Sequence, residues 1–280
     1  MALFTIDRSL CRRDGLCVAV CPASLVRLGE DGYPVPLAGR EQHCIRCGHC
    51  AAVCPSGALT HSLMPPETFT KTRKAPEAET IAVWLKARRS VRRYKDKPVP
   101  PEMIARVLDI ARYAPSGHNA QSVEWVVIAD RQGVEAVNAH VMQWSRAEVG
   151  VKSDLAKKLN LAGALRAFGH GKDVVCRGAP ALALAHGPAE GVTPREDGVI
   201  AVAWLELAAR AVGLASCFAG YVTFAASAYA PLAEALGLGA ERKVYGAAML
   251  GYPAVKYRLI PPRNEAKAVV LYGETLRPVD

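Results

Sequence analysis

Seven of the nine cysteines fall within the first 54 residues, and their spacing is the most chemically specific feature of the chain. The clearest run reads Cys44-x2-Cys47-x2-Cys50-x3-Cys54-Pro55. A tight loop of this spacing aims three thiolates at one side of a cubane, and the terminal Cys-Pro is where iron–sulfur proteins place a ligand of a second cluster. Zinc is the alternative for thiolates, but zinc sites usually use two separated cysteine pairs. The spacing therefore favours iron–sulfur clusters.

The same segment contains an internal repeat. Residues 11–22 align with residues 44–55 at a shift of 33, and eight of the twelve positions are identical. Such a repeat indicates duplication of one small unit. A unit of this size buries little apolar core, so we expect bound metal to stabilise it.

Over about 60 residues this segment resembles the two-cluster ferredoxins of bacterial type. The resemblance implies crossed ligation, in which each cluster takes its fourth ligand from the other copy. One cluster would be held by Cys44, Cys47, Cys50 and Cys21. The other would be held by Cys11, Cys17, Cys54 and, at the remaining corner, Asp14.

Asp14 stands where the first copy lacks its second cysteine, as in a minority of such ferredoxins. A carboxylate is a harder ligand than a thiolate and suits iron less well in a sulfur-rich site. Asp14 could ligate a [4Fe-4S] cluster, the site could hold a [3Fe-4S] cluster that lacks this corner, or Asp14 could be solvated in its loop. We favour the four-iron cluster because the rest of the run is intact.

A basic segment, RRSVRRY at 88–94, follows an amphipathic helical pattern. Arginine can bind phosphate through two parallel hydrogen bonds, and serine adds a hydroxyl donor. A solvated basic face is the alternative. Nucleic-acid binding would need a wider basic surface and aromatic platforms, and only 6% of the chain is aromatic.

Residues 80 to about 275 resemble the FMN-dependent nitroreductase family, and the fusion looks like its ferredoxin–nitroreductase subgroup. The resemblance rests on five segments in the family's order: RRSVRRY (88–94), YAPSGHNAQ (113–121), GLASCFAG (213–220), GYP (251–253) and PPR (261–263). It implies a homodimer with FMN at the interface. It also implies that residues 264–280 form an extension wrapping the partner, with 268–272 as an added strand.

The resemblance also implies roles for individual residues. The FMN phosphate contacts would be Arg88, Arg89, Ser90 and Arg263, and the contact near the ribityl chain and pyrimidine edge would be Arg92. The loop that usually reaches the flavin from the partner would contribute Pro115, Ser116, Gly117 and Asn119. The backbone beside the reactive edge would be Cys217, Phe218, Ala219 and Gly220. No residue is assigned as catalytic, because solvent or flavin N5 can supply the protons.

Some positions depart from the family or keep two interpretations. Ala219 stands where some members carry glutamate, so a role needing that carboxylate is lost. His118 is favoured as a structural hydrogen-bonding residue over a substrate contact. Cys176 is expected to be a small buried residue, whereas Cys217 could touch the flavin. Residues 140–175, with Trp144 and Phe168 among them, lie where the family varies its substrate cap.

The expected fold class is α+β: a nitroreductase-like FMN domain with a mostly antiparallel central sheet, preceded by a small ferredoxin-like domain with two clusters. The expected boundaries are 1–65 for the ferredoxin-type domain, 66–79 for a linker and 80–280 for the flavin domain. Helical patterns cover 80–90, 101–113, 133–145, 153–168, 195–213 and 224–237. Strands are expected at 124–130, 181–186, 244–250 and 268–272.

Composition and the absence of targeting signals exclude several classes of protein. The chain has 280 residues, of which 51% are hydrophobic and 22% charged, and this excludes a disordered protein. No export signal or membrane span is visible, so we expect a cytoplasmic protein whose cysteines are not a disulfide framework. The net charge of +9 would suit anionic FMN and an acidic electron carrier, or solubility alone.

Together these features predict an iron–sulfur flavoprotein oxidoreductase that passes electrons between clusters and FMN. The expected acceptor is a nitroaromatic, a quinone or an activated alkene, and the donor is NAD(P)H or reduced ferredoxin. No GxGxxG fingerprint is present, but this family can bind nicotinamide over FMN without one. The alternatives are a non-enzymatic electron-transfer or redox-sensing adaptor, and another flavin reaction such as reductive dehalogenation or oxygen-dependent flavin breakdown.

Overall fold

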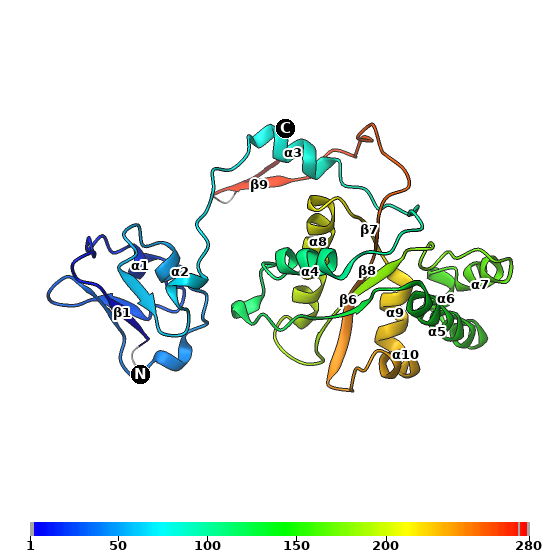
Figure 1. The fold of residues 1–280 in the computed structure, drawn as a ribbon, viewed down its shortest axis with the longest axis horizontal. Coiled ribbons are helices and arrows are strands. Elements are labelled where there is room, and N and C mark those ends of the chain that lie inside the picture. The colour runs from blue at the N-terminus through cyan, green and yellow to red at the C-terminus, as the bar shows by residue number, and fades with distance from the viewer. Residues whose placement is uncertain (1–2, 274, 279–280) are drawn as a thin grey trace.

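The computed structural model describes residues 3–273 and 275–278. Figure 1 shows a small N-terminal body beside a larger body built on a sheet and helices, with an extended segment running from one to the other. Each body has its own apolar core: the small one packs around Leu25 and Phe4, and the large one lies on both faces of its sheet.

The small body consists of two copies of one unit. In the first copy, α1 (Leu16–Ala19) precedes a hairpin of β2 (Val26–Leu28) and β3 (Pro34–Pro36); in the second, after the 3-10 turn η1 (Glu41–His43), α2 (His49–Ala52) precedes β4 (Leu59–His61). The last strand, β4, pairs with β1 (Phe4–Ile6) in antiparallel register. A shift of 33 residues carries α1 onto α2 and β2 onto β4, as the sequence repeat predicts.

The two copies also share their unusual backbone conformations. Arg13 and Arg46 have φ of 55° and 52°, and Gly15 and Gly48 have φ of 73° and 70°. Glycine meets no Cβ penalty at such angles, which explains its place before each short helix. A Cβ on Gly48 would also lie 3.1 Å from Met64 Sδ, so the start of the connecting segment packs over this turn.

The connecting segment is mostly exposed. It contains the 3-10 turn η2 (Pro66–Thr68), then irregular chain, then α3 (Ala78–Lys86). The helix expected at 80–90 thus begins at residue 78 and ends at residue 86.

The large body is organised around one antiparallel sheet, as expected. Its strands are ordered β5-β6-β8-β7, where β5 is Glu124–Ile128, β6 Ala181–Pro188, β8 Arg242–Gly251 and β7 Ala215–Phe218. Every pairing is antiparallel, with β6 and β8 central. The expected strands at 124–130, 181–186 and 244–250 are confirmed within a few residues, whereas β7 was not predicted as a strand.

Helices cover both faces of this sheet. Helices α4 (Pro101–Ala111) and α8 (Pro194–Ala211) pack on one face, and α5 (Arg131–Gly150) and α9 (Gly220–Ala228) on the other. Residues of β6 alternate accordingly, with Leu182 and Leu184 facing the second pair and alanines facing the first. The approach of α8 is close, because a Cβ on Gly246 of β8 would lie 2.9 Å from Val202 Cγ2.

Two predicted helices are each divided in the structure. The pattern at 153–168 forms α6 (Asp154–Lys158) and α7 (Leu161–Gly169), because Asn160 takes a left-handed φ of 51° and its Oδ1 accepts from Gly163 N to cap α7. The pattern at 224–237 forms α9 and α10 (Ala230–Ala235), separated at Tyr229, which has extended backbone. Periodicity alone cannot show such breaks, since the apolar spacing continues through them.

The C-terminal strand expected at 268–272 is confirmed as β9 (Val269–Tyr272). It pairs with β10 (Thr275–Pro278) in a separate hairpin rather than with the central sheet. Residues 274, 279 and 280 of the predicted extension lie outside the described residues. No helix in the described part of the chain is both long and apolar enough to cross a membrane.

Candidate functional site

The structure brings the first predicted ligand set together. Cys44, Cys47 and Cys50, from the loop before α2 and from α2 itself, line one cavity with Cys21 from the other copy. Because 23 positions separate Cys21 from Cys44 in the sequence, it is the fold of the duplicated unit that assembles the set.

The second predicted set lines a separate cavity. Cys11, Asp14 and Cys17 come from the first copy, and Cys54 comes from the end of the second. Asp14 Oδ1 accepts a hydrogen bond from Leu16 N at 3.1 Å, so ligation by Asp14 would use its other carboxylate oxygen.

The cysteines of both sets are partly or fully buried. No three metal-ligating side chains within residues 3–273 and 275–278 converge on a single ion. Burial, followed by the neighbouring thiols Cys47 and Cys21, raises the pKa of Cys50 to about 11. Bound metal would therefore hold this group as the thiolate, since ligation requires deprotonation.

A histidine that the sequence interpretation did not single out lies against the first cavity. His61 is 2% exposed, and its Nε2 lies 3.6 Å from Cys44 Sγ. Its Nδ1 accepts a hydrogen bond from Leu63 N at 3.1 Å, which places the ring proton on Nε2, facing the sulfur. Burial, and then the charge of Arg46, lowers the pKa of His61 and favours this neutral form. Aligning the two copies could have revealed His61, because the equivalent position of the first copy holds an apolar residue, Leu28.

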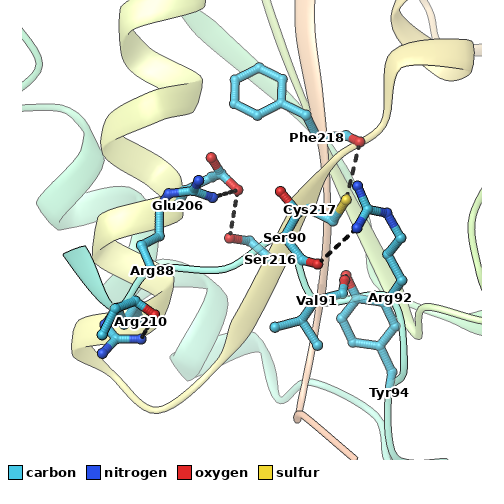
Figure 2. A network of polar contacts seen from close by, with 11 residues as sticks. Arg88, Ser90, Val91, Arg92, Tyr94, Glu206, Arg210, Ser216, Cys217 and Phe218 are labelled. Carbon is cyan, nitrogen blue, oxygen red and sulfur yellow. Dashed lines mark hydrogen bonds and ion pairs between the residues drawn. The ribbon is translucent and has the colours of Figure 1, made fainter. Parts of the chain in front are cut away.

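In the large body, the predicted phosphate-binding arginine contacts a buried carboxylate (Figure 2). Arg88 Nη1 lies 3.5 Å from Glu206 Oε1, and the same oxygen accepts from Ser216 Oγ at 3.2 Å. Glu206 belongs to α8 and is 5% exposed. Burial raises the pKa of Glu206, while Arg88 and Ser216 act in the opposite direction.

Arg92 lies on the other side of the strand that carries Ser216 and Cys217 (Figure 2). Its Nη1 donates to Ser90 O at 3.3 Å. The next carbonyl, Val91 O, accepts from Tyr94 Oη at 2.7 Å. The predicted residues 88, 90, 92 and 217 are therefore brought together around the beginning of β7.

An open cavity of ≈ 360 Å³ adjoins this group. Among the described residues, its lining includes three cations, Arg92, Lys158 and Arg177, and no carboxylate. Phe218 and Tyr221 also line it. Such a cavity suits a flat ligand that carries negative charge. Sequence reasoning missed Lys158 and Arg177, because only the tertiary fold brings them to residue 92.

Cys217 does not have the features of a reactive thiol. It is 3% exposed, and burial raises its pKa even though Arg92 opposes the effect. Cys176 is fully buried, as expected of a small apolar residue, and burial also raises its pKa. Trp144, which lies in the predicted substrate cap, is 2% exposed and packs in the core beside Met142, so it cannot line a substrate cavity in this structure.

The predicted loop at 113–121 lies away from the Arg88 group of the same chain. Gly117 N donates to Oδ1 of buried Asp197 at 2.9 Å, which fixes the loop at the beginning of α8. Asp197 and Glu206 are nine residues apart on α8, or about 14 Å along the helix axis. The loop and the Arg88 group are therefore separate within one chain.

Other predicted contacts also lie apart. Arg89 Nη2 donates to Lys86 O at the end of α3. Arg263 lies in the exposed irregular segment between β8 and β9, and Pro115 and His118 are exposed on their loop. Asn119 is directed at the small body: its Nδ2 donates to Ile45 O at 3.0 Å and to Arg46 O at 3.1 Å.

Comparison with known proteins places these features in two families. The model of the nitroreductase family matches residues 85–252, and that of a 4Fe-4S dicluster domain matches residues 9–59. The chain therefore belongs to the nitroreductase family and carries an N-terminal 4Fe-4S dicluster domain.

Solved structures agree with this assignment. A nitroreductase with bound FMN from Bacteroides fragilis NCTC 9343 is 26% identical, with a TM-score of 0.56 over 69% of this chain and 98% of its own. A nitroreductase with bound FMN from Desulfitobacterium hafniense DCB-2 is 20% identical, with a TM-score of 0.55 over 70% of this chain and all of its own, and this likeness shows the fold alone.

A curated relative matches only a short segment. A Methanothermobacter thermautotrophicus protein named as an NADH dehydrogenase/NAD(P)H nitroreductase is 36% identical over 53 residues, or 19% of this chain. The chain spans 28% of that relative's length.

Proposed function

We propose that this protein is an FMN-dependent oxidoreductase that passes electrons between two iron–sulfur clusters and FMN to reduce a small organic acceptor. The observation that carries the proposal is the presence of two complete four-ligand cavities on the chain that also holds the Arg88 and Arg92 groups of a nitroreductase domain. We propose domain boundaries at 1–65, 66–79 and 80–280.

The flavin site is built mainly from residues around the start of β7. Arg88, oriented by Glu206, and Ser90 would hold the phosphate, with Arg89 beside them and Arg263 as a further contact. Arg92 would face the pyrimidine edge, where its charge favours the anionic reduced flavin. The backbone of residues 217–220 would line the reactive edge. When bound, FMN can accept electrons one at a time and deliver them in pairs.

Asn119 faces the small body. The rest of its loop, with Pro115, Ser116 and Gly117, would serve the flavin of a second subunit in a homodimer. This is supported by its position about 14 Å along α8 from the Arg88 group of its own chain. Residues 264–280, with β9 in their described part, would wrap the partner.

We assign both clusters as [4Fe-4S]. Cys21, Cys44, Cys47 and Cys50 would hold one, and Cys11, Asp14, Cys17 and Cys54 the other. Asp14 is exposed but lines the second cavity, so we propose its second carboxylate oxygen as the ligand.

A nitroaromatic, quinone or activated alkene is the proposed acceptor class. The cavity beside Phe218, where Arg92 and residues 217–220 would hold the flavin, is open, so an acceptor could reach the bound flavin. This favours an enzyme over the second candidate, an adaptor whose flavin is sealed from solvent. NAD(P)H and reduced ferredoxin are the two proposed donors, and the name of the curated relative favours the first.

The experiment is an anaerobic turnover assay of the cofactor-loaded chain with one acceptor of each class. NADH, NADPH and reduced ferredoxin are supplied separately, and consumption of the acceptor is followed by chromatography. Reduction of at least one acceptor class is expected. Reduction of none of them, while the flavin still bleaches and reoxidises, would favour the adaptor.

A further inference from the structure

Asn119, at the tip of the 113–121 loop, donates two hydrogen bonds to the small body. An asparagine side-chain amide carries two N–H donors, and both have an acceptor here, at Ile45 O and Arg46 O. Each contact joins residues more than seventy positions apart. The two carbonyls also fix which end of the amide faces them, because its own oxygen would be repelled.

The acceptors belong to a cluster-binding loop. Ile45 and Arg46 are the two residues between Cys44 and Cys47, and Ile45 itself lines the cavity of the first ligand set. Arg46 has a left-handed φ of 52°, which is an unusual backbone conformation for a residue other than glycine. Asn119 therefore touches the backbone that holds two of the four thiols.

The base of the 113–121 loop is fixed as firmly as its tip. Gly117 donates to buried Asp197, and a Cβ at Gly117 would overlap Thr193 Oγ1, so the loop lies flat against the beginning of α8. His118 and Asn119 have φ of 51° and 55°, angles that asparagine tolerates better than most residues. The loop thus connects α8 to the cluster-binding loop through short, well-defined contacts.

The repeat provides an internal comparison. At a shift of 33, the counterparts of Ile45 and Arg46 are Arg12 and Arg13, and Arg13 has nearly the same φ, 55°. Both copies thus present a similar turn, but it is the second copy that receives Asn119. The contact with Asn119 therefore places the cluster-binding turn of the second copy, and not that of the first, against the flavin domain.

We propose that Asn119 is a positioning residue that docks the cluster-binding loop Cys44–Cys47 onto the flavin domain. The four-cysteine cluster is then the nearer one, and the Asp14 cluster the farther one, to the FMN that the 113–121 loop serves in the second subunit of the homodimer. This rests on the proposed function. It differs from the flavin contact that the family resemblance implies for Asn119. In the electron step, two one-electron oxidations of the clusters balance the two-electron reduction of one FMN, and water supplies the protons.

The test uses the full cofactor-loaded chain and the variants Asn119→Ala and Asn119→Asp. Alanine removes two hydrogen bonds, and aspartate also places negative charge against two carbonyl oxygens. The control is Gln132→Glu, which makes the same change of charge at an exposed position of α5. Three quantities are measured: amide hydrogen exchange, the FMN dissociation constant, and the rate of flavin bleaching after the clusters are reduced with substoichiometric dithionite.

We expect faster exchange at residues 44–48 in both Asn119 variants and unchanged exchange at the equivalent residues 11–15. The bleaching rate should fall about tenfold with alanine, from two hydrogen bonds of ordinary strength, and further with aspartate. The FMN dissociation constant should stay within about twofold of the parent, and Gln132→Glu should change none of the three.

Two results would overturn the docking role. One is weaker FMN binding with exchange at 44–48 unchanged, because Asn119 would then hold the flavin. The other is no change in either exchange or bleaching rate. If the parent clusters do not reduce the flavin at all, the proposed function fails, whereas the exchange measurement still decides whether Asn119 docks the loop.

Discussion

The guanidinium of Arg88 lies 3.5 Å from the carboxylate of Glu206, although the Glu206 side chain is only 7% exposed. The Arg88 side chain is 31% exposed. Its guanidinium therefore contacts Glu206 on one side and remains accessible on the other. This geometry suits an arginine that is oriented before an anion arrives, because less freedom is then lost on binding.

Replacement of this arginine should weaken FMN binding while leaving the clusters in place. Loss of hydrogen bonds to a charged group costs about 1.5–3 kcal/mol, so Arg88→Ala should raise the FMN dissociation constant about ten- to hundredfold. Flavin fluorescence measures this, with Arg106→Ala, an exposed arginine on α4, as the control.

Arg88→Ala also leaves the buried Glu206 without its partner charge, which could loosen the fold. The double variant Arg88→Ala/Glu206→Gln removes that unpaired charge. It should bind FMN as weakly as the single variant. Recovery of tight binding in the double variant would mean that Arg88 acts by neutralising Glu206 rather than by contacting phosphate.

The stability of the protein should depend on pH through Glu206. Because burial raises its folded pKa, its contribution to stability is fully present below the ordinary glutamate pKa and is lost as pH rises through the folded pKa. The Glu206→Gln variant does not titrate here, so it does not lose this stability as pH rises, and its amide oxygen can still accept from Ser216 Oγ. In thermal melts in the same cofactor state, the melting temperature of the variant should therefore rise relative to that of the parent between pH 4 and pH 8. A constant difference across this range would show that Glu206 titrates normally.

The hydrogen bond from His61 to Cys44 should tune one cluster. An N–H donor to a ligand sulfur stabilises the more negative, reduced cluster. His61→Leu, which copies Leu28 of the first repeat, should therefore lower the reduction potential of the four-cysteine cluster. A redox titration followed by electron paramagnetic resonance measures both clusters, and the Asp14 cluster is the internal control. Equal shifts of the two would point to a general structural effect.

Asp14 can be tested by iron content and spectroscopy. Two four-iron clusters correspond to eight irons per chain, and the oxidised protein should show no three-iron signal. Asp14→Cys should leave the iron content unchanged, whereas Asp14→Ala should lose one iron and acquire the three-iron signal. A gain of iron in Asp14→Cys would mean that the natural site holds the three-iron cluster.

The sequence predicted most about residues whose role depends on local spacing. Cysteine runs and a repeat at a shift of 33 were enough to group the residues that line the two cavities. The sheet and most helices followed from periodicity. Asn160 and Tyr229 break two predicted helices because left-handed or extended backbone at one residue leaves the apolar pattern unchanged.

Residues whose partners are distant were harder to predict. Glu206 could be noticed as a charge inside an apolar helix, but its contact with Arg88 spans 118 positions. Lys158 and Arg177 gain meaning only when the fold places them beside Arg92. Asn119 was recognised by its loop, yet its contacts with Ile45 and Arg46 need both domains in place.

The central claim is that clusters and FMN on one chain exchange electrons during turnover. The most direct test is anaerobic rapid mixing of the loaded protein with NADH, NADPH or reduced ferredoxin, with cluster and flavin absorbance followed separately. The account predicts that whichever cofactor is reduced first, the other follows at least as fast as turnover. Reduction that remains on the clusters or on the flavin for longer than a turnover would contradict it.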